Sequence, residues 1–276
     1  MRLFDAFSQM SWRTAGEYRA LAEAGVRAVV EPATWHGQPR THAGSFEDYF
    51  ASLLAWEPYR AGRAGVRHHC ALGLNAKEAN DAGLAEGVLW LLPRLLDKDG
   101  VVAVGALGFD EFSAAEDDAF ARQLELARQR SLPVVVRVAP RDGRRAVERS
   151  LALLREARLP VGLAVVTGVG EAALPLTLDS GCWAGLSLHP RDGLNARTAA
   201  ALARRYGPER VLVGAGADWD ESDALAVPAA ARALLDGGLG APAVERLLWD
   251  NPAAFFGQSG RLDLSTLEPQ AAARYP

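Results

Sequence analysis

The chain has 276 residues, of which 49% are hydrophobic and 23% charged, and its formal net charge is −4 at neutral pH. This composition excludes global disorder, and the length suits one large domain with a sizeable core. A net negative charge gives no reason to expect nucleic acid or an anionic membrane as a partner.

Nothing in the sequence predicts a membrane anchor. No apolar run reaches the roughly 18 residues that a bilayer-spanning helix needs. We also expect no secretion signal, because no charged segment leads into a long apolar run before the first strand. The two cysteines, Cys70 and Cys182, lie in strand-like runs and are expected to be small buried residues. These features favour a cytoplasmic protein.

Apolar runs that predict β-strands recur along the chain, with amphipathic helical stretches between them. The predicted strands are RLFDAF at 2–7, RAVVEP at 27–32, VRHHCAL at 66–72, VVAVGALGF at 101–109, PVVVRVA at 133–139, VGLAVV at 161–166, WAGLSLH at 183–189 and RVLVGAG at 210–216. Several are apolar on both faces, as strands of a buried parallel sheet are. Eight strand–helix units predict an α/β fold, a single-domain (β/α)8 TIM barrel.

Helix starts are also visible, since Thr14, Ser45 and Ser113 each precede an acidic residue by three positions, as an N-cap does. No Gly-x-Gly-x-x-Gly follows the first strand, so a dinucleotide-binding fold lacks its main support. We place the barrel at residues 1–260. Residues 261–276 show little periodicity and are expected to form a loosely packed C-terminal tail.

Several stretches together resemble one family of barrels. They are EPATWHGQPRTHAGSFEDYF, LGLNAKEAN, GALGFD, the tripeptide PRD at 140–142, GADWDESDALAVP and the terminal DNPAAFFGQSG. In this order they resemble the TatD-like metal-dependent hydrolases of the amidohydrolase superfamily, over roughly residues 2–260. The resemblance implies a (β/α)8 barrel and a hydrolase that uses one or two divalent metals.

The resemblance also implies where the metal ligands would stand. The family has His-x-His after strand 1, Glu after strand 4, His after strands 5 and 6, and Asp after strand 8. The corresponding positions here hold Phe7 and Gln9, Ala106, Arg137, Gly168 (or Thr167), and Asp218. Only the aspartate is retained.

These replacements predict that the family's metal site is lost and that the protein has no metal cofactor. Zinc and similar ions need three or four nitrogen, sulfur or oxygen ligands. Phe7 and Ala106 supply none, and the permanent charge of Arg137 would repel a dication. A relocated site stays open, because His36 and His42 flank one loop and could converge with Glu31 or Asp218. His68 and His69 are adjacent on a strand and therefore point to opposite faces.

Other residues at the strand ends suggest what replaces the metal. An ion pair between Arg137 and Asp218 would neutralise both groups, because a lone buried carboxylate is costly. The loops also carry cations that could clamp a carboxylate or a phosphate, and two tryptophans that could form flat walls. The predicted ligand-binding residues are Arg40, Lys77, Arg141, Trp35, Trp219 and His189.

Two hypotheses follow. The first is a non-catalytic, cytoplasmic relative that binds a small anionic molecule or a partner at the C-terminal face of the barrel. The alternative is a hydrolase of small anionic substrates, either with a relocated metal or metal-independent. In the metal-independent case Asp218 or Glu31 is the general base and Arg137 the electrostatic stabiliser, although Glu31 could instead anchor a loop. We expect neither nucleic acid nor a membrane as partner, and the oligomeric state stays open.

Overall fold

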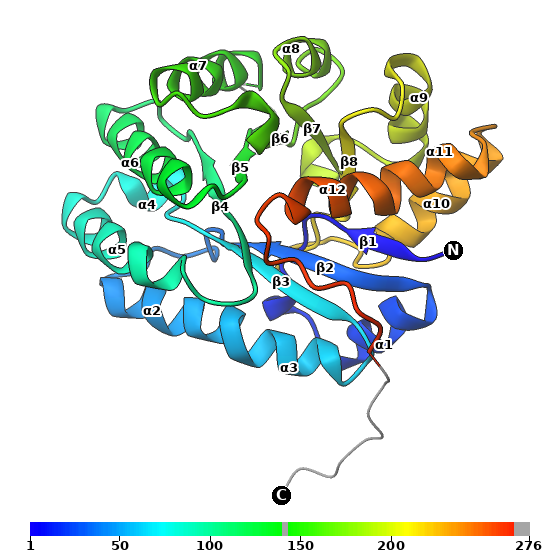
Figure 1. The fold of residues 1–276 in the computed structure, drawn as a ribbon, viewed down its shortest axis with the longest axis horizontal. Coiled ribbons are helices and arrows are strands. Elements are labelled where there is room, and N and C mark those ends of the chain that lie inside the picture. Colours follow the sequence, from blue (N-terminus) through cyan, green and yellow to red (C-terminus); the bar gives the residue numbers. More distant parts are fainter. Residues whose placement is uncertain (140–142, 268–276) are drawn as a thin grey trace, which may run out of the picture.

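The structure is a computed structural model that describes residues 1–139 and 143–267. Within these residues, eight parallel strands form one sheet in the sequential order β1 to β8. Helices surround the sheet as an outer layer (Figure 1). The predicted single-domain (β/α)8 TIM barrel is confirmed.

The strands are β1 (Leu3–Asp5), β2 (Val26–Pro32), β3 (Arg67–Leu72), β4 (Val101–Gly108), β5 (Val134–Arg137), β6 (Ala164–Thr167), β7 (Trp183–Ser187) and β8 (Val211–Gly214). All eight overlap the predicted runs. The main difference precedes β6, where Val161–Leu163 form a 3₁₀ turn instead of the first half of the strand.

The helices are α1 (Ala15–Glu23), α2 (Ala43–Ala51), α3 (Glu57–Gly62), α4 (Ala76–Ala79), α5 (Ala82–Leu95), α6 (Ala114–Arg130), α7 (Gly143–Glu156), α8 (Leu174–Asp179), α9 (Ala196–Tyr206), α10 (Ala226–Asp236), α11 (Ala241–Glu245) and α12 (Asn251–Gly257). Short π-helical segments join α2 to α3 and α11 to α12. In the described part of the chain, no helix is long and apolar enough to cross a membrane.

Two of the three predicted N-caps are confirmed. Thr14 forms a full capping box with Glu17 at the start of α1, and the Ser113 side chain accepts the Glu116 N–H at the start of α6. The Ser45 prediction is wrong, because the side chain of His42 accepts the Ser45 N–H and α2 therefore begins before Ser45.

The first and last strands meet and close the barrel. The Ala6 N–H donates to the Val213 carbonyl at 3.4 Å, and the Gly216 N–H donates to the Phe7 carbonyl at 2.6 Å. Beyond the strand ends, the Gln9 N–H donates to the Ala217 carbonyl at 2.6 Å. These bonds hold the loops after β1 and β8 side by side at the C-terminal end of the barrel.

The barrel interior is apolar at its N-terminal end and is closed there by α12. Phe255 and Phe256 on this helix belong to the interior cluster, and Phe256 stacks on Phe4 with ring centroids 6.0 Å apart. A second, larger cluster lies between the sheet and the surrounding helices. Both cysteines are buried, as predicted.

Residues 261–267 differ from the expected loose tail. The Asp263 carboxylate pairs with Arg67 at 3.0 Å, and the Asp263 N–H donates to Nε2 of His69 at 3.1 Å. Leu262 and Leu264 pack against the interior cluster. This segment, the last one drawn in red, crosses β2 and β3 in Figure 1. The remaining tail, residues 268–276, lies outside the described residues.

Candidate functional site

Two adjoining cavities lie at the C-terminal ends of the strands. The outer cavity has a volume of about 300 Å³, and the smaller one, which we call the well, has about 60 Å³. Both are lined by Thr34, Ala106, Arg137 and Asp218, so the well continues from the outer cavity. This is the end of a (β/α)8 barrel at which active sites occur.

The well occupies the place where the family resemblance puts the metal. Its lining includes Phe7 and Gln9 from the end of β1, Ala106 from β4, Arg137 from β5, Thr167 from β6 and Asp218 after β8. The structure therefore brings together the positions aligned with the family's metal ligands. It also adds Ser187 from the end of β7, which the sequence did not single out.

The ring of Phe7 fills space that two glycines provide. A Cβ atom on Gly185 would lie 2.8 Å from Cε2 of Phe7, and one on Gly214 would lie 2.8 Å from Cδ2 of the same ring. Contacts this short are not tolerated in a packed interior. The side chain of Phe7 is buried, with 3% of the residue exposed. An apolar ring therefore stands where the resemblance expects the first metal-binding imidazole.

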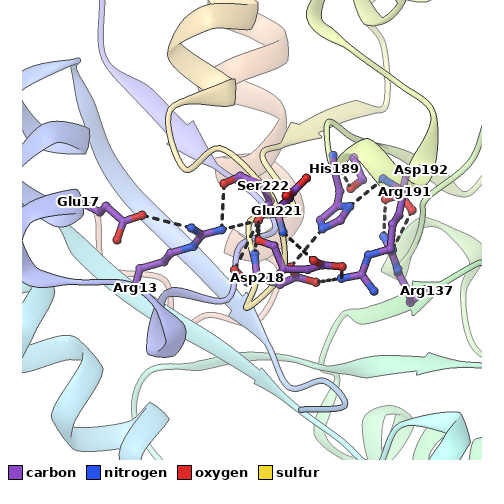
Figure 2. Close-up of polar contacts among 11 residues, drawn as sticks. Arg13, Glu17, Arg137, His189, Arg191, Asp192, Asp218, Glu221 and Ser222 are labelled. Carbon is purple, nitrogen blue, oxygen red and sulfur yellow. Dashed lines mark hydrogen bonds and ion pairs between the residues drawn. The ribbon is translucent and has the colours of Figure 1, made fainter. Parts of the chain in front are cut away.

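Asp218 is held by three groups around its carboxylate (Figure 2). Nε2 of His189 lies 3.1 Å from Oδ1, and the Asp220 N–H donates to the same oxygen at 2.8 Å. Nη2 of Arg191 donates to Oδ2 at 2.7 Å. Burial acts to raise the pKa of Asp218, but the His189 hydrogen bond, the Asp220 N–H and the Arg191 charge outweigh it, and the pKa lies below its ordinary value.

The contacts of His189 define which of its nitrogens carries the proton. Nδ1 accepts the backbone N–H of Arg191 at 2.9 Å, so this nitrogen presents a lone pair to the main chain. In the neutral ring the other nitrogen then carries the hydrogen, which it donates to Asp218. As arranged here, neither ring nitrogen has a lone pair available for a metal ion.

The donor set at the end of the barrel does not fit the family's metal. Asp218 is the one position that keeps a family ligand, and both of its oxygens accept hydrogen bonds. Within the described residues there is no group of three or more His, Cys, Asp or Glu side chains that could hold an ion.

Arg137 pairs with a different acid from the one predicted. Nη1 and Nη2 donate to the two oxygens of Asp192 at 2.7 and 2.8 Å, a bidentate pair, and the Asp192 side chain is fully buried. The expected Arg137–Asp218 ion pair is therefore wrong. Asp192 follows β7 and reaches Arg137 at the end of β5, whereas Asp218 is neutralised by Arg191 (Figure 2).

Arg13 ties the loop after β1 to the loop after β8. Its Nη2 donates to both the carbonyl and the hydroxyl oxygen of Ser222, and its Nη1 pairs with Glu17 at 3.3 Å. The Ser222 hydroxyl in turn accepts the Asp218 N–H at 3.0 Å. Arg13 therefore positions the Asp218 loop and does not face either cavity.

Glu31, predicted as an alternative base, lies on the other side of the barrel wall. Its neighbours Val30 and Pro32 face the interior, so the side chain of Glu31 points to the helices. There it accepts the Ser11 hydroxyl at 2.6 Å and the Ser11 N–H at 3.1 Å, and Nε2 of His68 lies 3.0 Å away. Glu31 is fully buried and lines neither cavity. It fits a loop anchor and cannot reach a ligand at the mouth.

Arg40 is also placed away from both cavities. Its guanidinium pairs with Glu78 at 3.1 Å, donates to the Thr34 carbonyl at 2.6 Å and stacks on the ring of Phe46 at 3.8 Å. These contacts stabilise the loop after β2. The predicted role of Arg40 as a ligand clamp is therefore not supported by its position.

Lys77, Trp35 and Trp219 do line the outer cavity, as predicted from their places after β3, β2 and β8. The two indole rings pack edge to face with centroids 6.3 Å apart. Nζ of Lys77 lies 4.5 Å from the Trp35 ring, and the Arg191 guanidinium lies 5.1 Å from the Trp219 ring. The predicted ligand residue Arg141 lies outside the described residues.

The other histidines lie apart from one another and do not form a metal-binding group. His42 caps α2, and His36 packs between Trp12 and Tyr49. His68 and His69 point to opposite faces of β3, as predicted, toward Glu31 and toward the Asp263 N–H.

Arg191 and Asp192 lie at the centre of the site, although they were not among the site residues predicted from the sequence. They belong to the tetrapeptide PRDG at 190–193, which directly follows the predicted seventh strand and repeats PRDG at 140–143. A charged turn at the end of a barrel strand was a usable signal. Its partners, however, lie 27 and 55 residues away along the chain.

Comparisons with known proteins agree with this architecture. No family model matches the chain. A curated relative, an uncharacterized metal-dependent hydrolase of Methanocaldococcus jannaschii, is 22% identical over 211 residues, which cover 76% of this chain and 82% of that protein. The TatD-like protein of Archaeoglobus fulgidus has a TM-score of 0.74 at 24% identity, over 92% of this chain and 99% of the other.

More distant structures share the barrel. The phosphotriesterase homology protein of Escherichia coli, complexed with phosphate in its active site, has a TM-score of 0.66 at 15% identity, over 92% of this chain and 98% of that one. A resiniferatoxin-binding protein of Rhodobacter sphaeroides has a TM-score of 0.69 at 16% identity, over 90% and 75%. The fold is thus shared with a TatD-like barrel over nearly the whole chain. The resemblance seen in the sequence is confirmed, and the similar proteins include a hydrolase.

Proposed function

We propose that this chain is a non-catalytic TatD-like barrel that has lost the family's metal site and binds a small anionic molecule at its C-terminal face. The observation that carries the proposal is that His189 and Asp218 already have hydrogen-bond partners. They hydrogen-bond to each other, Nδ1 of His189 accepts the Arg191 N–H, and Oδ2 of Asp218 accepts a hydrogen bond from the Arg191 guanidinium. Opening this network to admit an ion would leave buried groups without partners.

Three cations on the outer cavity support an anionic ligand. Lys77, Arg137 and Arg191 all line it, together with Asp110, Asp192 and Asp218. Asp192 takes one hydrogen bond from each terminal nitrogen of Arg137, which leaves three of the five guanidinium N–H groups for a ligand, counted over the described residues. Arg forks of this kind suit carboxylate and phosphate groups.

The metal-independent hydrolase has less support. A general base works best with a pKa near the working pH, whereas the pKa of Asp218 is lowered and its oxygens are occupied. Glu31 is separated from the cavities by the barrel wall. A cytoplasmic location remains a prediction from composition.

The test is a thermal-shift screen of the purified protein against acetate, benzoate, inorganic phosphate and phenyl phosphate at constant ionic strength, with benzamide as a neutral control. We expect saturable stabilisation by at least one anion, weakened about tenfold or more in Kd by Arg191→Gln. Arg205→Gln, on the exposed face of α9, is the matched control. Failure of every anion, or steady turnover of an ester, amide or phosphoester panel that Asp218→Asn abolishes, would overturn the proposal.

A further inference from the structure

One buried hydroxyl in the well has no partner. Oγ1 of Thr167 makes no hydrogen bond to any described residue, although only 3% of the residue is exposed. Thr167 lies at the end of β6 and lines the well. Because a buried hydroxyl without a partner is destabilising, its presence points to a polar group that enters the well from outside the chain.

The side chains around Thr167 indicate which hydrogen bonds the entering ligand group must accept. Arg137 lies next to Thr167 in the β5–β6 register and can only donate hydrogen bonds. Gln9 and Ser187 add a neutral amide and a hydroxyl to the same lining. A group that accepts hydrogen bonds from both Arg137 and Thr167 satisfies the hydroxyl, and an oxyanion is the strongest such acceptor.

Charge favours a carboxylate over a phosphate, and size permits it. The well has about 60 Å³, and a water-sized group needs about 10–15 Å³, so roughly four to six such groups fit. A carboxylate brings three heavy atoms and fits easily, whereas a phosphate brings five in a tetrahedron and would nearly fill the well. Asp218 also lines the well, and its charge repels a dianion more strongly than a monoanion.

The outer cavity offers room for a flat apolar body. Trp35 and Trp219 contribute flat surface to its lining, and the buried Leu107 and Phe109 border it at the end of β4. Aromatic and apolar surface of this kind is common in small-molecule sites. A ligand that extends from the well enters this cavity.

We propose that the ligand is a carboxylate carried on a flat apolar body, such as an aromatic acid, with its carboxylate in the well between Thr167 and Arg137 and its ring in the outer cavity. This inference rests on the proposed anion-binding function and names its ligand class. Benzoate is the simplest probe of it.

The first experiment compares five probes by isothermal titration calorimetry on the full chain. Benzoate is expected to bind at least about tenfold more tightly than acetate, which lacks the ring, and than benzamide, which lacks the charge. Phenyl phosphate and inorganic phosphate are expected to bind more weakly than benzoate. Tighter binding of either phosphate would overturn the carboxylate assignment while leaving anion binding intact.

The second experiment uses Thr167→Val, which removes the hydroxyl and keeps the shape. We expect benzoate affinity to fall about tenfold with no loss of thermal stability in the free protein, since the hydroxyl has no partner to lose. Thr177→Val is the matched control, because its buried hydroxyl donates to the Ala173 carbonyl. It should lower stability and leave benzoate binding unchanged.

Three outcomes of these experiments would refute either the carboxylate position or the proposed function. Unchanged benzoate affinity in Thr167→Val would place the carboxylate elsewhere and refute the inference. A destabilised free Thr167→Val protein would show that the hydroxyl already has a partner, such as a fixed water, and would also refute it. Absence of binding by all carboxylates and phosphates would refute the proposed function itself.

Discussion

Nε2 of His189 lies 3.1 Å from Oδ1 of Asp218, while Nδ1 of the same ring accepts the Arg191 N–H at 2.9 Å. The imidazole is thereby used at both nitrogens, one toward the carboxylate and one toward the main chain. This arrangement turns the one retained family ligand into a member of a closed hydrogen-bond network.

The protein is expected to carry well under one metal ion per chain after incubation with excess zinc, manganese and nickel. Stable binding of these ions requires three or four donors, and the described residues supply no such group. Elemental analysis of desalted protein measures the ratio. One tight ion per chain, lost in Asp218→Asn, would show a relocated metal site.

Asp218→Asn is expected to reduce stability at pH 7 by about 1–3 kcal/mol, because the amide replaces a charged acceptor facing Arg191 and His189. The lowered pKa of Asp218 sets the pH dependence. The stabilisation is complete above the ordinary aspartate value of 3.8 and is lost as pH falls through the lower folded-state pKa. Urea unfolding at pH 7 and near pH 3 should therefore give a smaller difference between the two proteins at the acidic pH. A difference independent of pH would contradict this assignment.

Glu31→Gln is expected to destabilise the fold by about 2–4 kcal/mol without changing anion affinity. The substitution weakens the bonds that Glu31 accepts from Ser11 and His68 behind the barrel wall. Urea midpoints and calorimetric titration measure the two effects, with exposed Glu23→Gln as control. Loss of anion binding at unchanged stability would instead show that Glu31 takes part in anion binding.

Phe7 and Gly185 are expected to be energetically coupled. Gly185→Ala should cost about 1–3 kcal/mol by overpacking, because its Cβ would lie 2.8 Å from the Phe7 ring. Part of that cost should disappear in a Phe7→Ala background, in which the ring is absent. Since a Cβ on Gly185 also meets Cβ of Thr167, the relief is incomplete. A double-mutant cycle measures the coupling, with Gly162→Ala, which has free space around its Cβ, as control.

Stability is expected to fall as the pH drops from about 6.5 to about 4. Burial, assisted by the Arg40 charge, lowers the pKa of His36 from 6.5 to about 4, and burial next to His68 lowers that of His69 to about 4. The unfolded chain therefore binds more protons in this interval, and the folded state loses stability as pH decreases. Urea midpoints across the interval should decline less steeply in His36→Gln. Equal slopes would show that His36 already titrates near its ordinary value.

The strand positions were readable from the sequence, because strands of a buried parallel sheet are apolar on both faces and recur with helical stretches between them. The barrel and the identity of the strand-end residues followed from this pattern. Thr14 and Ser113 also capped their helices as predicted, since the N-cap signal is local.

The predictions that failed each concerned a side chain whose partner or direction the sequence pattern did not identify. No sequence pattern distinguishes Asp192 from Asp218 as the partner of Arg137, because both acids follow barrel strands. The helix begins before Ser45 because the side chain of His42, three positions earlier, accepts the Ser45 N–H and caps it. Glu31 was assigned to the mouth by position alone, although one step of strand alternation directs its side chain to the helices.

By itself, the sequence determined which residues stand at the strand ends, because their identity does not depend on packing, and the resemblance implies that five of six ligand positions are replaced. Only the tertiary structure decided how the remaining groups are used. Arg191, His189 and Asp218 join into one network because the pairing of β7 with β8 brings the loops after these strands together. The register of β5 with β6 places Thr167 beside Arg137 in the well, with its hydroxyl unpaired among the described residues.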